Sequence, residues 1–406
     1  MNRQIENNIS SYPWFQFSSS LFGWLPVFFL FFNQFVSLSE VILLGAFYYF
    51  SVCIFEVPSG YFSDRVGRRI SLMIAGFAYI LANLAFLTAD GFISLVFGQF
   101  FLALGIAMLS GTDTAFLYDS LLSANREQEY ASYEAKGQAF SMAALCLSAL
   151  AGGLLGMYDL RWPYFLSLFG AVWMLWLVWR FVEPATHRLN QTLDTTLWRT
   201  ISECFRHLRD GVLAWLFGVM VLMYSLEHVV YEFYQPYIKL LEISWLSADS
   251  SPLVSGIVIA TSMFGGTIGA AYSVRLSRRV GIKALLLSAF VIQLAIIASV
   301  SIFLSSLALG MVILRNFPMA MIHAPVNAAI APRIGSHLRA TYLSLQSLSA
   351  RLAFSCLLLG LSSLVASQES IEWQSLSLVL RSALIYGAIG VAIALILAPA
   401  TMNKKQ

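Results

Sequence analysis

The sequence predicts an all-α membrane protein with 12 transmembrane helices in two six-helix bundles. Of its 406 residues, 59% are hydrophobic and 11% are charged, and the mean hydropathy is +0.75. Soluble domains carry about 25% charged residues, so this composition cannot cover a water-exposed surface. The apolar runs reach the ~20 residues that a helix needs to cross a bilayer, whereas membrane barrels use alternating segments of about ten residues. Helices are expected because a backbone in lipid must satisfy its own hydrogen bonds.

The expected helices follow one another with few residues between them. Turn residues such as Ser37 and the pair Asp90-Gly91 separate neighbouring apolar runs, so consecutive helices should lie antiparallel. At ~20 residues a span plus short turns, the chain holds about 12 crossings. The predicted spans are 14–36, 39–62, 68–89, 92–120, 135–158, 162–182, 212–238, 252–274, 282–304, 307–330, 341–366 and 379–400.

One long polar segment divides the spans into two groups of six. Residues 183–211 contain Pro184 and several basic residues. We therefore expect an N-terminal six-helix bundle at 1–183, a cytoplasmic linker at 184–211 and a C-terminal six-helix bundle at 212–406.

The basic residues lie mostly on one side of the predicted membrane. With the N-terminus inside the cell, 19 of the 24 Lys and Arg residues fall at cytoplasmic positions and three fall outside, at Arg161, Lys239 and Arg381. Arg315 and Arg351 lie within helices. Since basic residues are retained on the cytoplasmic side during insertion, both termini are expected in the cytoplasm. This placement accounts for the net charge of +3, so we expect no nucleic-acid partner.

The N-terminus and the cysteines add no further feature. The segment MNRQIENNISSYP lacks the short apolar core and cleavage site of a signal peptide, so the first apolar segment is expected in the mature protein. The cysteines are expected to be free thiols rather than a disulfide framework. They are Cys53, Cys146, Cys204 and Cys356.

A distinctive motif joins the second and third spans. It reads Gly60-Tyr61-Phe62-Ser63-Asp64-Arg65-Val66-Gly67-Arg68-Arg69. This resembles the signature loop of the major facilitator superfamily, G-x-x-x-D-[RK]-x-G-[RK]-[RK]. Arg275-Leu276-Ser277-Arg278-Arg279-Val280-Gly281 repeats the pattern in the second half without the aspartate. The stretches 55–60, 111–119 and 339–341 also look like a bacterial twelve-helix subgroup that contains drug, metabolite and siderophore carriers.

Each residue of the signature loop has a physical role that suits a hairpin at the membrane surface. Gly60 allows close helix packing and Gly67 a tight turn. Asp64 can bind the positive N-terminal end of a facing helix. The arginines Arg65, Arg68 and Arg69 can meet carboxylates and lipid phosphates.

Charged residues within the spans are the candidates for a functional site, because a charge in the bilayer interior costs at least about 2.5 kcal/mol. The resemblance implies that spans 1, 4, 7 and 10 line a central cavity. The candidates for substrate or coupling are Asp113 on span 4, Glu227, His228 and Tyr231 on span 7, and Arg315, Asn316 and His323 on span 10. Tyr224, His228, Tyr231 and Gln235 recur at helical spacing and form one face. A Glu227–Arg315 pair is the leading hypothesis for the site, and a structural ion pair is the alternative.

A second group of residues suggests a gate. Glu56 shares a helix face with Gly60 and Asp64. In the superfamily, span 2 approaches span 11, where Arg351 lies at a matching depth. We therefore expect a Glu56–Arg351 contact when the cytoplasmic side is closed. Asp119 is expected to pair with Arg68 or Arg69.

The resemblance implies a secondary transporter that moves a small solute across a bacterial inner membrane by alternating access. Buried carboxylates and the two span histidines favour coupling to protons. Gln99 and the pair Ser148-Ala149 stand where drug antiporters carry other residues, which favours a metabolite or siderophore carrier over multidrug efflux. A non-transporting receptor on the same fold is an alternative from another class. We expect a monomer in the lipid bilayer, with no cofactor, no metal site and no enzymatic activity.

Overall fold

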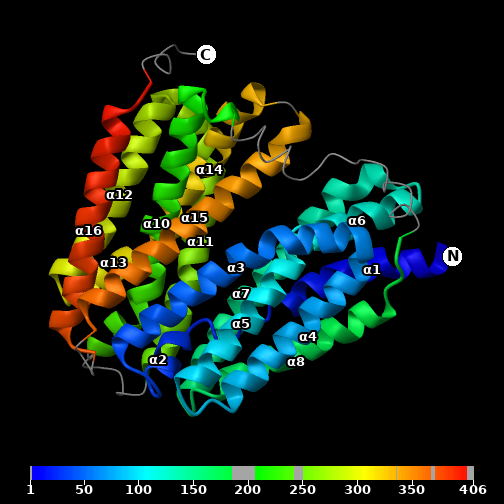
Figure 1. Cartoon of the computed structure of the whole chain (residues 1–406), viewed down its shortest axis with the longest axis horizontal. Helices are drawn as coiled ribbons and strands as arrows, with labels where there is room; N and C mark the ends of the chain where they lie inside the picture. The colour runs from blue at the N-terminus through cyan, green and yellow to red at the C-terminus, as the bar shows by residue number, and fades with distance from the viewer. Residues whose placement is uncertain (1, 185–205, 242–249, 335, 367–370, 400–406) are drawn as a thin grey trace. The chain divides into compact units, whose positions relative to one another are not determined.

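The computed structural model describes residues 2–184, 206–241, 250–334, 336–366 and 371–399 (Figure 1). These residues form helices and connecting turns, and contain no strand. The helices of the first half are α1 (Asn2–Ser19), α2 (Phe28–Phe32), α3 (Leu38–Val66), α4 (Arg68–Leu87), α5 (Phe92–Leu109), α6 (Thr112–Ser123), α7 (Tyr130–Gly156) and α8 (Trp162–Arg180). Those of the second half are α10 (Gly211–Leu240), α11 (Ser251–Val280), α12 (Ile282–Ile302), α13 (Ser306–Val312), α14 (Asn316–Ile330), α15 (Ser336–Leu364) and α16 (Trp373–Ile396). Two short 3₁₀ turns, Glu127–Glu129 and Ala331–Arg333, complete the described elements.

Eleven helices among the described residues are long and apolar enough to cross a membrane, against the 12 expected. The difference lies in the first expected span, 14–36. A polar helix, α1, begins already at Asn2 and ends at Ser19, and the short α2 follows only at Phe28. Residues 20–27 form turns and irregular chain between α1 and α2, so this stretch is two helices and not one. The other spans agree with the prediction to within a few residues at most ends.

Two further expected spans are also interrupted. The fourth is broken at Ser110 and Gly111, where Gly111 has a φ of +72° that favours glycine. The tenth is broken between α13 and α14, at residues 313–315. The three interruptions thus fall on spans 1, 4 and 10.

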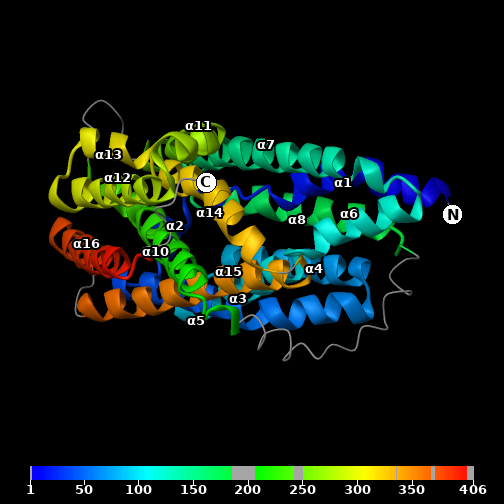
Figure 2. The same cartoon turned by 90° about the horizontal axis from the view of Figure 1, so that it is seen from above.

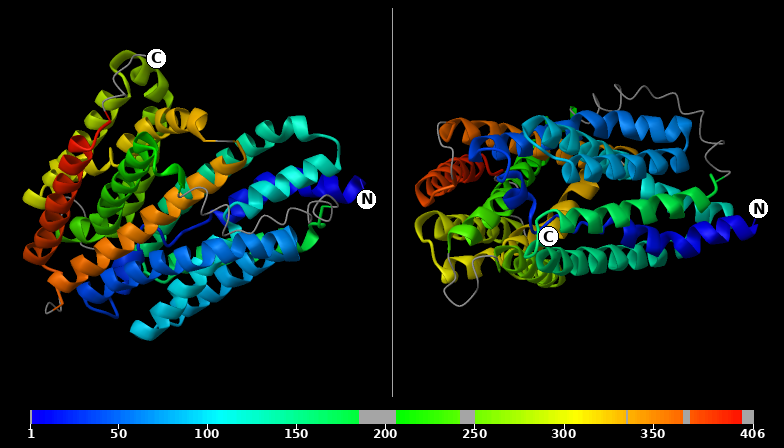
Figure 3. Two further views of the ribbon diagram at one scale, coloured as in Figure 1. Left: turned by 45° about the horizontal axis from the view of Figure 1, so that its top comes forward. Right: turned by 90° about the horizontal axis from the view of Figure 1, so that it is seen from below.

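The chain forms two compact units. Unit 1 lies within Met1–Val36, Phe47–Asp194 and Asp249–Ala260. In it, α4 packs against α5 and α8, and α1 packs against α7 and α8 (Figure 2). Unit 2 lies within Ser37–Ala46, Thr195–Ala248 and Thr261–Gln406. In it, α10 packs against α15 and α16, and α16, red in Figure 3, lies beside the orange α15.

Each unit includes the first turns of a helix that continues in the other unit. The start of α3 belongs to unit 2, where the Ser355 hydroxyl donates to the Ala46 carbonyl oxygen at 2.8 Å. The start of α11 belongs to unit 1, where a Cβ at Gly153 would lie 2.7 Å from the Pro252 carbonyl oxygen. A Cβ at Gly256 would collide with the Ala149 carbonyl oxygen. Only glycine allows the backbones to approach this closely.

Large apolar side chains cover much of the outer surface of the long helices. Trp179 is 72% exposed, Ile93 71% and Phe169 61%. Such surfaces are unfavourable in water and suit contact with lipid chains.

Candidate functional site

The signature loop turns tightly between α3 and α4. Gly67 has a φ of +130°, and Gly281, its counterpart in the second half, has a φ of +81°. Both residues stand directly before a helix, α4 and α12, and side chains other than hydrogen are strained in this conformation. The tight turn expected at Gly67 is therefore present in both halves. The close packing expected at Gly60 is not seen, because no described atom lies within 4 Å of the Cβ position there.

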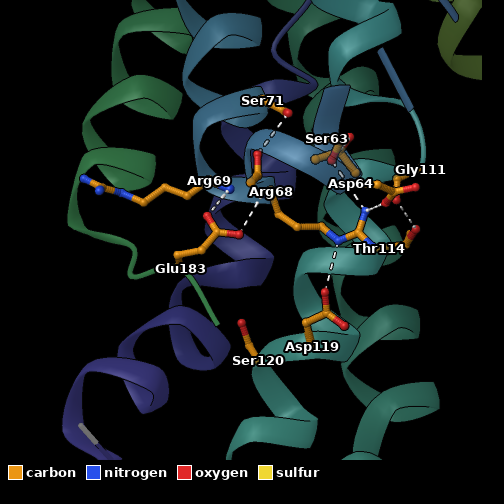
Figure 4. Close-up of polar contacts among 12 residues, drawn as sticks. Ser63, Asp64, Arg68, Arg69, Ser71, Gly111, Thr114, Asp119, Ser120 and Glu183 are labelled. Carbon is orange, nitrogen blue, oxygen red and sulfur yellow. Dashed lines mark hydrogen bonds and ion pairs between the residues drawn. The ribbon is translucent and has the colours of Figure 1, made fainter. Parts of the chain in front are cut away.

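Arg68 connects two aspartates across unit 1 (Figure 4). Its guanidinium lies 2.9 Å from the carboxylate of Asp64 and 3.0 Å from that of Asp119. Asp119 is buried, so Arg68 compensates a charge that would otherwise be costly. Asp119 was expected to pair with Arg68 or Arg69, and in the structure it pairs with Arg68. Asp64 also pairs with Arg68, whereas the sequence suggested a contact with a helix end.

The N-terminus of α4 is bound by a carboxylate that sequence reasoning missed. Glu183 accepts hydrogen bonds from the backbone N–H groups of Arg68 at 2.7 Å and Arg69 at 2.9 Å (Figure 4). These are orphan donors of the first helical turn, and a negative charge is favourable at this positive end. In the sequence Glu183 stands only at the start of the polar segment, and a contact across 115 residues of chain leaves no local pattern.

The other gating candidates have separate environments. Arg69 donates to the carbonyl oxygen of Trp179 at 2.9 Å, and the guanidinium carbon of Arg65 lies 4.8 Å from the centre of the Tyr61 ring. Glu56 belongs to unit 1 and Arg351 to unit 2, so their pairing stays a prediction.

A charged cluster in unit 2 brings together three of the predicted site residues. A carboxylate oxygen of Glu227 lies 2.9 Å from His228 Nδ1, and the other lies 4.0 Å from Arg315 Nη1. Arg315 is only 4% exposed, and its Nε has no hydrogen-bond partner among the described residues. Arg315 lies in the break between α13 and α14, just beyond the C-terminal end of α13, where a cation is favourable.

Aromatic rings enclose this cluster. The guanidinium carbon of Arg315 lies 4.9 Å from the ring centre of Tyr231 and 5.8 Å from that of Tyr234, which gives cation–π attraction. The ring of His228 stacks on Tyr224 with centroids 3.7 Å apart. The aromatic face expected along this helix is therefore present, on α10.

The Nδ1 atom of His228 faces a carboxylate and a backbone carbonyl oxygen. Nδ1 lies near two acceptors, the Glu227 carboxylate and the Tyr224 carbonyl oxygen at 3.0 Å. With Glu227 ionised, a hydrogen on Nδ1 can be donated to either of these acceptors.

The remaining unit 2 candidates lie apart from these contacts. His323 is exposed, and its Nδ1 is 3.5 Å from the Asn327 amide nitrogen. Asn316 begins α14, and its Cβ packs close to Gly266. Glu232, a further carboxylate on α10, is 3% exposed and makes no hydrogen bond or ion pair with the described residues.

Unit 1 contains a cavity of about 250 Å³ beside the break in span 4. Asp113 lines it from the first turn of α6, and accepts a hydrogen bond from Gln16 Nε2 at 2.7 Å. The same Gln16 nitrogen lies 2.6 Å from the Tyr12 hydroxyl. Glu134 and Gln138 on α7 complete the polar wall.

Sequence reasoning found Asp113 but missed the other polar residues of this wall. The fifth span was expected to begin at 135, whereas α7 begins at Tyr130 and brings Glu134 into the helix. The first span was expected to begin at 14, whereas α1 already carries Tyr12. Gln16 and Gln138 fall inside the expected spans, where uncharged polar residues were not singled out. No group of three His, Cys, Asp or Glu among the described residues is arranged to hold a metal ion.

Comparison with known proteins identifies the family. A model described as Major Facilitator Superfamily matches residues 14–357. The chain belongs to this superfamily. It is a multi-pass membrane transporter with a small-molecule substrate, and not an enzyme. No curated sequence matches the chain.

Solved structures of this superfamily share the fold over nearly the whole chain. A point mutant of the nucleoside transporter NupG has a TM-score of 0.79 at 11% identity, covering 98% of this chain and 100% of that one. A D-xylose-proton symporter has a TM-score of 0.71 at 17% identity, with 100% of both chains covered. A bacterial homolog of the human lysosomal transporter Spinster has a TM-score of 0.69 at 15% identity, covering 97% and 96%. The predicted all-α fold of this superfamily is thereby confirmed, although the described residues contain 11 of the 12 expected membrane-spanning helices.

Proposed function

We propose that this transporter is a secondary carrier that moves a small polar metabolite across the inner membrane by alternating access, coupled to protons. The observation that carries the proposal is that charged residues stand at the breaks of spans 4 and 10. Discontinuous helices form the substrate and ion sites of many transporters, because their ends present unpaired backbone groups at mid-membrane. Asp113 stands in the first turn after the break in span 4, and Arg315 stands in the break of span 10. The basic-residue pattern supports cytoplasmic termini.

The cluster around Glu227 is the proposed coupling site. In its ionised form Glu227 balances Arg315 and accepts from His228 Nδ1. A proton added to Glu227 removes that balance and leaves the Arg315 charge with only its aromatic neighbours. The two protonation states therefore favour different arrangements around the break before α14, which is what a coupled carrier requires.

The size of the unit 1 cavity supports a small metabolite over a drug. About 250 Å³ lies below the roughly 300–1,000 Å³ of sites for drug-sized ligands. A multidrug exporter would instead confer resistance when overproduced, which a susceptibility assay measures directly.

Proteoliposomes that contain a pH-sensitive dye test the proposal. Solutes that stabilise the purified protein against heat are added outside, and solute flux and internal pH are recorded together. Flux with proton movement supports the proposal, and binding without flux contradicts it in favour of a receptor. Glu227→Gln should retain binding and lose proton movement. Glu129→Gln, at an exposed surface ion pair, is the matched control and should behave as wild type.

A further inference from the structure

The cavity of unit 1 carries negative charge without a compensating cation. Asp113 and Glu134 both line it, and none of its lining residues is Lys, Arg or His. Neither carboxylate forms an ion pair with the described residues. The N-terminal end of α6 and the Gln16 amide stabilise Asp113 in part. A bound cation would supply the full counter-charge that the lining residues lack.

A second observation points to a ligand in the same cavity. Tyr79 also lines it, is 3% exposed, and its hydroxyl has no hydrogen-bond partner among the described residues. Buried polar atoms nearly always have a partner, so an unsatisfied hydroxyl beside an open volume indicates a place for a ligand donor or acceptor.

The groups around the cavity match one ligand chemistry. The carboxylates of Asp113 and Glu134 accept hydrogen bonds, as the Tyr79 oxygen can, and an ammonium group has three donors and no acceptor. The rings of Tyr12 and Phe22 line the same space and can attract a cation. The amides and hydroxyls that remain suit a small polar body. An anionic solute would meet two like charges and no basic side chain.

We propose that the cavity of unit 1 binds the ammonium group of the transported solute, so that the substrate is a small polar amine. The inference rests on the proposed transport function and adds the substrate class to it. Asp113 and Glu134 act as counter-charges, and Tyr79 accepts a hydrogen bond from the ammonium group.

Matched pairs of probes test this inference in the purified full-length protein. Thermal stabilisation and affinity are measured with glucosamine against glucose, ethanolamine against ethylene glycol, and phenethylamine against 2-phenylethanol. At least one amine should stabilise the wild type, and its neutral counterpart should not. The inference is overturned if the neutral members stabilise equally or if no amine stabilises the protein.

Variants locate the binding site. Asp113→Asn should weaken amine binding by about 10- to 100-fold, the range of one charge-assisted hydrogen bond. Tyr79→Phe should weaken it by a smaller factor. The control is Tyr164→Phe, because Tyr164 is an equally buried unit 1 tyrosine whose hydroxyl lacks a described partner but which does not line the cavity. Equal effects of the two tyrosine variants would contradict the inference.

The result separates this inference from the transport proposal. Amine binding that depends on Asp113 but drives no flux would refute transport and leave the site intact. Unchanged amine binding in Asp113→Asn, with altered pH dependence of flux, would identify Asp113 as a proton site and overturn the inference.

Discussion

The two units differ in which of their charges have a partner. In unit 1, the charges near the signature loop have partners, because Arg68 pairs with Asp119 and Glu183 binds the N-terminus of α4. Asp113 and Glu134 in the cavity have no described cationic partner. In unit 2 the arrangement is reversed. Glu227 is balanced in the membrane interior, whereas Arg278 and Arg279 of the equivalent loop form no ion pair with the described residues.

This reversal suggests a division of roles between related halves. An interior site that holds its own counter-charge can respond to a proton, because protonation changes an existing balance. An interior site without a counter-charge instead selects what it binds. The halves share a helix arrangement with breaks near the charges, and the residues at those breaks set the difference.

Removing one partner of the unit 2 cluster should have the largest effect on stability. Glu227→Leu leaves the buried Arg315 uncompensated and should lower the free energy of unfolding by about 3–5 kcal/mol. The double variant Glu227→Leu/Arg315→Leu should recover more than half of that loss, because no isolated charge is left. Denaturant titration of the purified protein measures both. Additive losses would show that the two residues are not coupled.

Replacing a carboxylate by the amide of the same shape should lower stability in unit 2 but not in unit 1. Glu227→Gln loses charge-assisted contacts and should cost about 1.5–3 kcal/mol. Asp113→Asn removes an uncompensated charge, retains an acceptor for Gln16, and should leave stability unchanged or raise it. Melting temperatures of the two ligand-free variants check this. A comparable loss in both would break the contrast between the units.

The glycines that precede α4 and α12 allow a matched comparison of the equivalent loops in the two units. Gly67→Ala and Gly281→Ala both strain a positive φ, at about 1–3 kcal/mol each. A Cβ at Gly67 would also lie 3.0 Å from a Glu183 carboxylate oxygen, whereas no described atom lies within 4 Å at Gly281. Gly67→Ala should therefore melt at the lower temperature. Equal melting temperatures would mean that the Glu183 contact adds no constraint.

The cap on α4 should give the smallest effect. Glu183→Gln keeps an acceptor for one backbone N–H but loses the charge at the helix N-terminus, at about 0.3–1 kcal/mol. Glu183→Ala should cost more, because both N–H groups lose their partner. Hydrogen exchange at the first turn of α4 measures the difference, and faster exchange confined to other helices would argue against the cap.

Hydropathy was sufficient to predict the long helices, and the spacing of residues along α10 was sufficient to predict its aromatic face. Both are local properties that the bilayer or a helix face imposes directly. The breaks were not predicted, because short polar stretches such as those beginning at Ser110 and Arg315 stand inside spans that are apolar on both sides. Pro318, which stands in the first turn of α14, is a signal that a new helix begins nearby.

Contacts between residues that are far apart in the sequence were also not predicted. Glu183 lies far from Arg68 in the sequence, and Gln16 lies 97 residues from Asp113. Gln16 meets Asp113 because α1 packs against α6, and Glu183 meets Arg68 because it directly follows α8, which packs against α4. The Arg68–Asp119 contact could be anticipated because a recognised loop supplied one of its members.

The first turns of α11, which belong to unit 1, affect the order in which the units can assemble during synthesis. The backbone around Ala149 and Gly153 in unit 1 packs against Pro252 and Gly256, which are translated about 100 residues later. At about 5–20 residues per second, the ribosome needs about 5–20 seconds to supply them. During that interval the surface of unit 1 around Gly153 lacks the start of α11 that packs against it. A truncated form that ends before residue 252 would leave this surface without the start of α11.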